Sequence, residues 1–403
     1  MDFMNLRNFS TVKARRAALE KDLKVELPNI GSFSVDEKIA SSRNCENMIG
    51  SAKVPLGIAG PIKIKNSPPA GLVGKLKIKN YYVPLATTEG ALVASVNRGC
   101  KAIYESGGAH VDSYKVGPTR GAVFQVNNLK DSDSLNSFLE RQLPRLKQIT
   151  ASASRHLTLK KVFSRGVGRY RFVRFIFDSG EAMGMNMVTI ATTLLCQNIE
   201  KETGARCITV AANYDTDKKP SWLNIIEGRG YKVWSEAEIP GVKVTKILKT
   251  TPEKIYEVWL AKCMIGSAMA GSMGYNAHFA NILAAIFIAT GQDPAHVAEC
   301  TTGITTVEVM SRRKSTANND SRSLYVSIYL PDLMVGTIGG GTGLATQKEA
   351  LQILGLSQAA PDSARKLAEI IAAAALAGEL SLLASLAEGS LARAHQSLAR
   401  SKA

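Results

Sequence analysis

Several features that would define a protein class are missing from this sequence of 403 residues. Its six cysteines are scattered, with no CxxC pair and no Cys/His cluster of zinc-finger spacing, so no structural metal site is indicated. No uninterrupted apolar run is longer than that of residues 370–377, which is well short of the roughly 20 residues that span a membrane. The N-terminal stretch has no apolar core and no cleavage site for a signal peptide. These absences predict a cytoplasmic protein with free thiols, no metal and no membrane.

Acidic residues are also in short supply. Asp and Glu number 34 against 50 Lys and Arg, which gives a formal net charge of +16. A charge of that size indicates a polyanionic partner, either nucleic acid or a phosphate-rich small molecule. Aromatic residues make up only 6% of the chain and no known nucleic-acid-binding module is present, which counts against the first partner. The hydrophobic share of 45% is enough for a folded core.

The pattern of apolar residues predicts an α+β protein. Residues 1–45 read as a small N-terminal helical domain, in which Ser10 or Thr11 caps a helix that runs to Lys24. From Glu46 the chain changes character, and alternating apolar residues predict strands. Further predicted elements are strands 54–64, 75–88 and 323–336 and helices 87–106, 250–272, 276–290 and 363–400.

A second unit is predicted between residues 121 and 212. Its elements follow the order β-α-β-β-α-β, which resembles a ferredoxin-like split β-α-β unit. The predicted elements are strands 121–126, 160–165, 169–177 and 206–212 and helices 134–154 and 185–203. This small domain would be inserted into a large mixed α/β domain made of residues 46–120 and 213–403.

Two glycine-rich segments are candidates for binding an anion. GEAMGMN (180–186) follows a strand and opens a helix, where backbone N–H groups and the helix dipole favour a phosphate. It also fits an ordinary tight strand-to-helix turn. TIGGGTG (337–343) has three consecutive glycines that let a ligand approach the backbone. Two such segments in one basic chain favour a dinucleotide.

Three polar segments have both a functional and a structural interpretation. Lys218 in TDKKP can stabilise an oxyanion, or the segment is a helix start with Asp217 near its cap. Glu89 in ATTEG can donate a proton, or it is an acid in the first turn of a helix. In GQDP, Asp293 is either functional or a helix cap between Gly291 and Pro294.

The five histidines give no catalytic triad pattern. His278 and Asn281 are three residues apart and share a helix face. His395 lies near the chain end, where it could act as a proton donor only if the C-terminal segment folded over a site.

Taken together, these segments resemble the class I 3-hydroxy-3-methylglutaryl-CoA (HMG-CoA) reductases, in a soluble archaeal-like form. The matching runs, which span residues 46–343, are ENMIG with VPLGIAGP, PLATTEGALVASVNRGCKAI, GPTRG, GEAMGMN, NYDTDKKPSWLNIIEGRG, GSAMAGSMGYNAHFANILAAIFIATGQDPA and GTIGGGTGL. The resemblance implies a four-electron reduction of HMG-CoA to mevalonate and CoA by two hydride transfers from NADPH. It also implies a homodimer or homotetramer with the active site at a subunit interface.

The resemblance implies four catalytic residues. Lys218 would offset negative charge on the substrate oxygen. His395 would protonate the CoA thiolate, and Glu89 would give a proton to the alkoxide. Asp293 would hold Lys218 and Glu89 in one network and raise the pKa of Glu89.

The resemblance also implies the binding residues. Positions matching those that meet HMG-CoA are Ser95, Asn97, Arg98, Lys101, Arg120, Asp217, Lys219, Lys249, Lys262, His278 and Asn281. Those matching NADP contacts are Ser154, Arg155, Met183, Gly184, Met185, Asn186, Gly339, Gly340 and Gly341. Ser154 and Arg155 would meet the adenosine 2′-phosphate and favour NADPH over NADH. The chain departs from the family's usual pattern at Glu181, where relatives carry Asp, and at Ala211, where relatives often carry a substrate-binding serine.

Two other hypotheses come from different classes. A nucleic-acid-binding protein would explain the charge and would be retained on DNA in a salt-dependent way. An inactive acyl-CoA-binding homologue would bind CoA without oxidising NADPH. The joint presence of Glu89, Lys218, Asp293 and His395 argues against the second.

Overall fold

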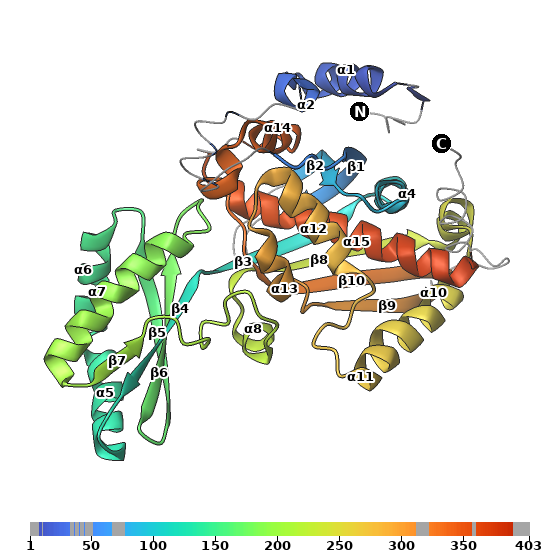
Figure 1. Cartoon of the computed structure of the whole chain (residues 1–403). Helices are drawn as coiled ribbons and strands as arrows, with labels where there is room; N and C mark the ends of the chain where they lie inside the picture. Colours follow the sequence, from blue (N-terminus) through green and yellow to red (C-terminus); the bar gives the residue numbers. More distant parts are fainter. Residues whose placement is uncertain are drawn as a thin grey trace.

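Two β-sheets with helices packed against them make up the chain (Figure 1). This computed structural model describes residues 8–9, 11–32, 36, 40, 44, 51–66, 77–311, 322–356 and 360–389. His395 and the end of the predicted helix 363–400 lie outside the described residues. The mixed architecture confirms the predicted α+β class.

The larger sheet has the strand order β2-β1-β3-β8-β10-β9. β1 and β3 are parallel, and the other neighbours are antiparallel. Its strands are β1 (Leu56–Asn66), β2 (Lys77–Ala86), β3 (Ala109–Gly117), β8 (Gly230–Pro240), β9 (Ile304–Ser311) and β10 (Arg322–Leu333). The sequence did not indicate β3, β8 or β9. In β8, buried and more exposed residues alternate along most of the strand, but apolar Trp234 is on the exposed side and polar Ser235 on the buried side, which weakens the alternating apolar signal.

Helix α15 (Ser363–Glu388) lies at the centre of the larger core. It packs against α4 (Leu92–Glu105), α12 (Phe279–Thr290) and α10 (Pro252–Trp259), and against β3, β8 and β10. By length and composition it could cross a membrane, but 78% of its most apolar window is buried inside the protein. Such burial is that of a core helix. The other helical segments of the larger part are α8 (Trp222–Glu227), α9 (Gly241–Lys243), 244–248, 260–266, α11 (Ser267–Met269), 294–296, α13 (Val297–Cys300), 340–343 and α14 (Ala345–Ile353).

The smaller sheet is antiparallel, with the order β5-β6-β4-β7. Its strands are β4 (Thr119–Gln125), β5 (Thr158–Val167), β6 (Tyr170–Asp178) and β7 (Arg206–Thr209), and its helices are α5 (Leu129–Arg141), α6 (Leu143–Ala153) and α7 (Met185–Thr203). The chain order is that of a split β-α-β unit, in which the first strand lies between the third and the fourth. These elements enclose a second hydrophobic core of their own.

The helix predicted over 134–154 is two helices. α5 ends at Arg141 and α6 begins at Leu143, with Pro144 in its first turn. Proline has no N–H to donate and clashes with the carbonyl four residues earlier, so the helix stops and starts again.

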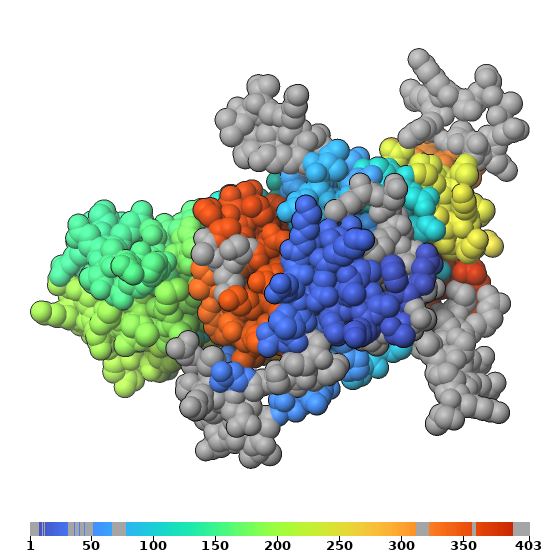
Figure 2. All heavy atoms as spheres, turned by 90° about the horizontal axis from the view of Figure 1, so that it is seen from above, coloured from blue at the N-terminus to red at the C-terminus, as the bar shows by residue number. Residues whose placement is uncertain are grey.

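The described N-terminal segment packs on the larger part of the molecule. Helix α1 (Val12–Leu23) begins at Thr11, whose hydroxyl accepts a hydrogen bond from Ala14 N at 3.1 Å. In the first turn of α2 (Pro28–Ser32), the backbone N–H groups of Asn29 and Ile30 both donate to the carboxylate of Glu349 in α14. Figure 2 shows this segment, in dark blue, lying over the larger part and away from the green unit of the smaller sheet.

Gly99 permits the closest helix contact in the larger core. A Cβ on this residue of α4 would lie 1.9 Å from the carbonyl oxygen of Ala377 in α15. We expect Gly99→Ala to lower the free energy of unfolding by about 3 kcal/mol, because two buried backbones must separate. Urea unfolding measures it. Gly343→Ala is the control, since a Cβ there meets nothing within 4 Å. Equal stability of the two variants would contradict this packing.

Candidate functional site

The two glycine-rich segments of the sequence lie against each other. Ala182 and Ile338 form a parallel β-bridge, and Thr337 N donates to Glu181 O at 2.8 Å. The segment 337–343 also packs on the GQDP turn, where a Cβ on Gly291 would lie 2.4 Å from the carbonyl carbon of Gly341. Loops from three distant parts of the chain therefore form one continuous surface.

Helix α7 begins on this surface with free donors. Gly184 precedes it with a φ of +84°, and no side chain caps its first turn, which contains no acidic residue. Gly339 and Gly340 have positive φ values, and a Cβ on either would meet nothing within 4 Å. Within the described part of the chain, this surface thus offers the backbone N–H groups of an uncapped helix start and open space beside glycines, which suits a phosphate-bearing group.

Glu181 has a structural task that the sequence did not indicate. Its carboxylate accepts hydrogen bonds from Asp362 N at 2.9 Å, Ala364 N at 2.7 Å and Ser363 Oγ at 3.1 Å. It therefore caps the N-terminus of α15, where no local side chain does so. The acid of the glycine-rich segment fixes the core helix to the site.

Lys218 and Asp293 form an ion pair on the same surface. Lys218 Nζ lies 2.7 Å from Asp293 Oδ2, and the two side chains are 41% and 35% exposed. Asp293 Oδ1 meanwhile accepts from Ala295 N at 3.0 Å and caps the turn 294–296. Burial opposes ionisation of Asp293, but the hydrogen bonds from Lys218 and Ala295 and the nearby His296 hold its pKa below the usual value. The interpretation of Asp293 as a helix cap is confirmed, and the same carboxylate also pairs with Lys218.

Lys218 itself is held in an unusual conformation. Its φ is +59°, and Thr216 nearby has a φ of +63°. Such angles are costly for residues with a side chain and persist where the surroundings enforce them, commonly at functional sites. The interpretation of TDKKP as a helix start is wrong, because α8 begins at Trp222 with Ser221 as its cap.

A cluster of buried charges lies behind this pair, and the sequence did not indicate it. Arg229 is fully buried and donates to Asp217 Oδ1 at 2.8 Å and to Glu299 Oε1 at 2.5 Å. Arg120 reaches Asp215 at 3.1 Å and Asp217 Oδ2 at 3.4 Å. Burial opposes ionisation of Asp217, but Arg229, the nearby His296 and Arg120 hold its pKa below the usual value.

Three members of this cluster could in principle hold a metal ion. One ligand atom each from Asp217, His296 and Glu299 lies within 4.8 Å of the others. The guanidinium of Arg229 already bonds both carboxylates. A metal would have to share them with a buried positive charge, so this donor set fits the arginine better than an ion.

Glu89 belongs to a different set of contacts. Its Oε1 accepts from Asn281 Nδ2 at 3.3 Å, and Asn281 lies 3.5 Å from His278 Nδ1. Buried Glu379 fixes the backbone before α12 by accepting from Ala277 N at 2.7 Å and His278 N at 2.6 Å. Within the described part of the chain, no contact joins Glu89 to Lys218 or Asp293, so the predicted single network of the three is not formed there.

The predicted CoA-binding residues of α4 hold α15. Arg98 donates to Ser381 O at 2.6 Å and to Ser385 Oγ at 2.5 Å, and Ser95 Oγ donates to Ser381 Oγ at 3.0 Å. Asn97 accepts from Gly60 N at 3.0 Å. Lys101 is 3.9 Å from Glu105 on the outside of the helix.

The remaining predicted basic residues are accessible. Lys219, Lys249 and Lys262 are exposed, and Lys249 has a left-handed φ of +62°. Arg155 is exposed and lies beside Ser154, whose Oγ is 3.9 Å from Met187 Sδ in the first turn of α7. This pair therefore adjoins the glycine-rich start of α7, whose residues Met183, Met185 and Asn186 complete the predicted set.

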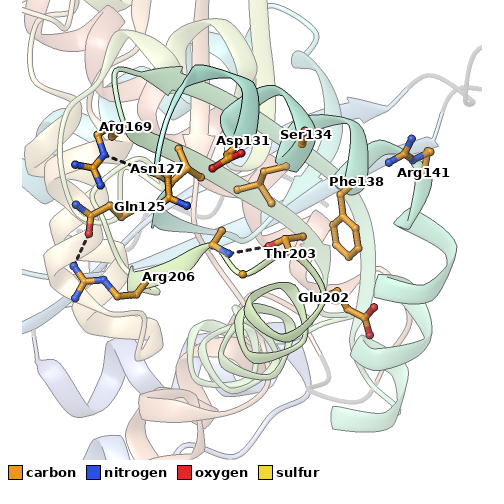
Figure 3. Close-up of a pocket in the computed structure, with 14 residues that line it drawn as sticks. Gln125, Asn127, Asp131, Ser134, Phe138, Arg141, Arg169, Glu202, Thr203 and Arg206 are labelled. Carbon is orange, nitrogen blue, oxygen red and sulfur yellow. Dashed lines mark hydrogen bonds between the residues drawn. The ribbon is translucent and has the colours of Figure 1, made fainter.

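A hollow of about 480 Å³ lies elsewhere, at the far end of the smaller sheet (Figure 3). The hollow is lined by Gln125, at the end of β4, and by Gly204, which follows α7. Arg120 lies at the other end of β4, where it pairs with Asp217 beside Lys218. None of the predicted site residues lines this hollow. Its arginines, Arg141, Arg169 and Arg206, are exposed.

Known proteins identify the family. The sequence model of the hydroxymethylglutaryl-coenzyme A reductase family matches residues 11–400. The chain is 45% identical over 390 residues to 3-hydroxy-3-methylglutaryl-coenzyme A reductase of Methanothermobacter thermautotrophicus, covering 96% of this chain and 93% of that protein. Identity to the enzyme of that name from Pyrococcus horikoshii is 46% over 391 residues, covering 96% and 91%.

A solved structure shares the fold. The class II 3-hydroxy-3-methylglutaryl-CoA reductase from Streptococcus pneumoniae, bound to NADPH, matches with a TM-score of 0.73 at 19% identity, covering 94% of this chain and 98% of that one. The chain is thus built on the fold of a CoA-thioester reductase. It belongs to the HMG-CoA reductase family, as the sequence resemblance predicted.

Asp332 gives a test of the buried charge cluster. Burial, and then the neighbouring Glu299, raise the pKa of Asp332 well above its usual value. An acid with a higher pKa in the folded chain makes stability fall as pH rises above its unfolded pKa. Asparagine cannot ionise, so this loss is absent in Asp332→Asn. We expect the free energy of unfolding of Asp332→Asn, relative to that of wild type, to increase from about pH 5 to about pH 8.

Urea unfolding of both proteins at the two pH values measures this difference. Asp133→Asn is the control, because that aspartate side chain is 84% exposed. A loss of stability in Asp332→Asn that is the same at both pH values would show that the carboxyl group is not held neutral.

Proposed function

We propose that this chain catalyses the reduction of HMG-CoA to mevalonate and CoA with two molecules of NADPH. The observation that carries the proposal is the Lys218–Asp293 ion pair, 2.7 Å long, on a surface formed with both glycine-rich loops. Family membership over residues 11–400 supports the same activity.

NADPH fits the loop surface described above, and when bound it supplies hydride to the thioester carbonyl and then to the aldehyde. The donors at the start of α7 suit its pyrophosphate. The open space beside Gly339 and Gly340 allows close approach to the backbone. Exposed Arg155 is available for the 2′-phosphate.

The chain's own residues would handle charge and protons. Lys218, which Asp293 holds at 2.7 Å, would offset negative charge that builds on the substrate oxygen. Glu89 would supply a proton to the alkoxide, and His395 a proton to the departing CoA thiolate. His278 and Asn281, which adjoin Glu89, would orient the substrate together with Arg120 and Lys219.

The separation of Glu89 from Lys218 supports a site completed by a second copy of the chain. In the described residues Glu89 contacts Asn281, whereas Lys218 contacts Asp293. We therefore propose a homo-oligomer in which the two sets of residues meet across a subunit interface. The small unit 121–212 would carry the dinucleotide and the larger part the CoA thioester.

Stoichiometry tests the activity. Loss of NADPH absorbance is followed with HMG-CoA, and released CoA is titrated as free thiol. We expect two NADPH oxidised for each CoA released. A folded protein that binds CoA and oxidises no NADPH would support the inactive homologue, and salt-dependent retention on DNA without CoA binding would support the nucleic-acid hypothesis.

Replacement of Lys218 tests the proposed oxyanion group. We expect Lys218→Ala to lower turnover by at least about 100-fold, because a positioned charge that stabilises an oxyanion is worth that much. Folding and CoA binding should remain. Lys201→Ala, an exposed lysine at the end of α7, is the control. Normal turnover in Lys218→Ala would exclude the assigned role.

Arg155 tests the preference for NADPH. We expect Arg155→Ala to raise the KM for NADPH about tenfold and leave that for NADH unchanged, because one charge-assisted hydrogen bond to the 2′-phosphate is lost. Steady-state rates with both cofactors measure it. Lys147→Ala is the control, because Lys147 is exposed on α6, the helix that ends just before Ser154 and Arg155. An equal rise for both cofactors would place Arg155 elsewhere on the dinucleotide.

A further inference from the structure

His296 lies between the exposed ion pair and the buried charge cluster. Its side chain is fully buried. Nδ1 contacts Glu299 Oε1. Nε2 lies 3.7 Å from Asp293 Oδ2 and 3.9 Å from Asp217 Oδ1, and among the residues that the structure describes it has no hydrogen-bond partner. A buried ring nitrogen thus points at two carboxylates of the site.

The nearer of these oxygens is the one that holds the lysine. Asp293 Oδ2 lies 2.7 Å from Lys218 Nζ and 3.7 Å from His296 Nε2. The carboxylate is therefore placed between a cation that faces the site and a ring that faces the interior. A shift of the ring would move the carboxylate and, with it, the ammonium group.

The ring is itself fixed from the interior. Glu299, fully buried, accepts from Arg229 NH1 at 2.5 Å and from Asn224 Nδ2 at 3.4 Å, and also contacts His296 Nδ1. Arg229 also donates to Asp217. The two carboxylates that lie near the two ring nitrogens, Glu299 and Asp217, are therefore held by the same guanidinium group. The imidazole has little freedom to rotate.

The groups around the ring carry more negative than positive charge. Three carboxylates face it, those of Asp217, Asp293 and Glu299. The cations that touch these carboxylates are Lys218, Arg229 and Arg120, and Arg120 is shared with Asp215. A positive charge on the imidazole would be attracted to this excess of negative charge, whereas a neutral side chain of similar size would not.

We propose that His296 is a positioning residue for the reduction: its buried ring, with Nε2 3.7 Å from Asp293 Oδ2, backs the carboxylate that holds Lys218 and keeps that carboxylate in place. The inference rests on the proposed function of Lys218. His296 is buried and touches no surface of the site, so it acts through Asp293. The chemical step should depend on it, while substrate binding should not.

The test compares His296→Gln with His110→Gln, a histidine replacement on β3 away from the site. Glutamine keeps an N–H group of similar size and cannot carry the charge. We expect His296→Gln to lower kcat about tenfold, because the ammonium group is misplaced. The KM values for HMG-CoA and NADPH should change less than about twofold.

The pH profile separates this role from simple loss of stability. Lys218 and His296 are the groups that face Asp293, and both favour its ionised form. Without the His296 charge, Asp293 takes up a proton at higher pH, so the acid limb of kcat should move up by about one unit. Unchanged kcat and an unchanged acid limb would overturn the proposal. A higher KM with normal kcat would also overturn it.

A measurement without substrate keeps the inference independent of the activity. Protein carrying ¹³C at the aspartate carboxyl carbons is titrated by NMR, and Asp293→Asn assigns the Asp293 signal. We expect the Asp293 midpoint to be higher in His296→Gln than in wild type, and equal midpoints would overturn the proposal even if HMG-CoA is not the substrate. His296→Asn, with the same expectations, replaces His296→Gln if circular dichroism shows that variant unfolded.

Discussion

The burial of α15 is the constraint on which the rest of the structure depends. An apolar helix of this length must be covered along its whole surface, since exposure of so many alanines and leucines to water would be unfavourable. The buried carboxylates on it are therefore matched to partners elsewhere in the chain. Glu369 accepts from Ser113 on β3 at 2.7 Å and from Asn66 on β1 at 2.8 Å, and Glu379 holds the backbone before α12.

The same helix connects the separate parts of the site. Glu181 ties its N-terminus to the glycine-rich loop that opens α7. Farther along, Glu379 fixes the segment that carries His278, and Arg98 of α4 donates to Ser381. Because these contacts are spread over one rigid element, the loop positions are set by the core.

A second constraint comes from charges that water does not reach. Arg229 and Glu299 are both fully buried, and removing either would leave an uncompensated charge in the interior. Such a pair is retained more for the geometry that it enforces than for net stability. Here it fixes Asp217 directly and faces Asp293 through His296. The exposed Lys218 is thus held by a chain of charges that begins in the core.

The sequence by itself determined the α+β class, the family, and the helices and strands with clear apolar periodicity, such as α4, α7 and β6. It also marked Lys218, Asp293 and both glycine-rich loops, because their motifs are local. Only the tertiary structure decided that these loops touch, that Glu181 caps α15, that Arg98 holds the same helix, and that Arg229, His296 and Glu299 form one cluster. Those contacts join residues far apart in the chain, and a lone charged residue in a sequence looks alike whether water or a buried partner surrounds it.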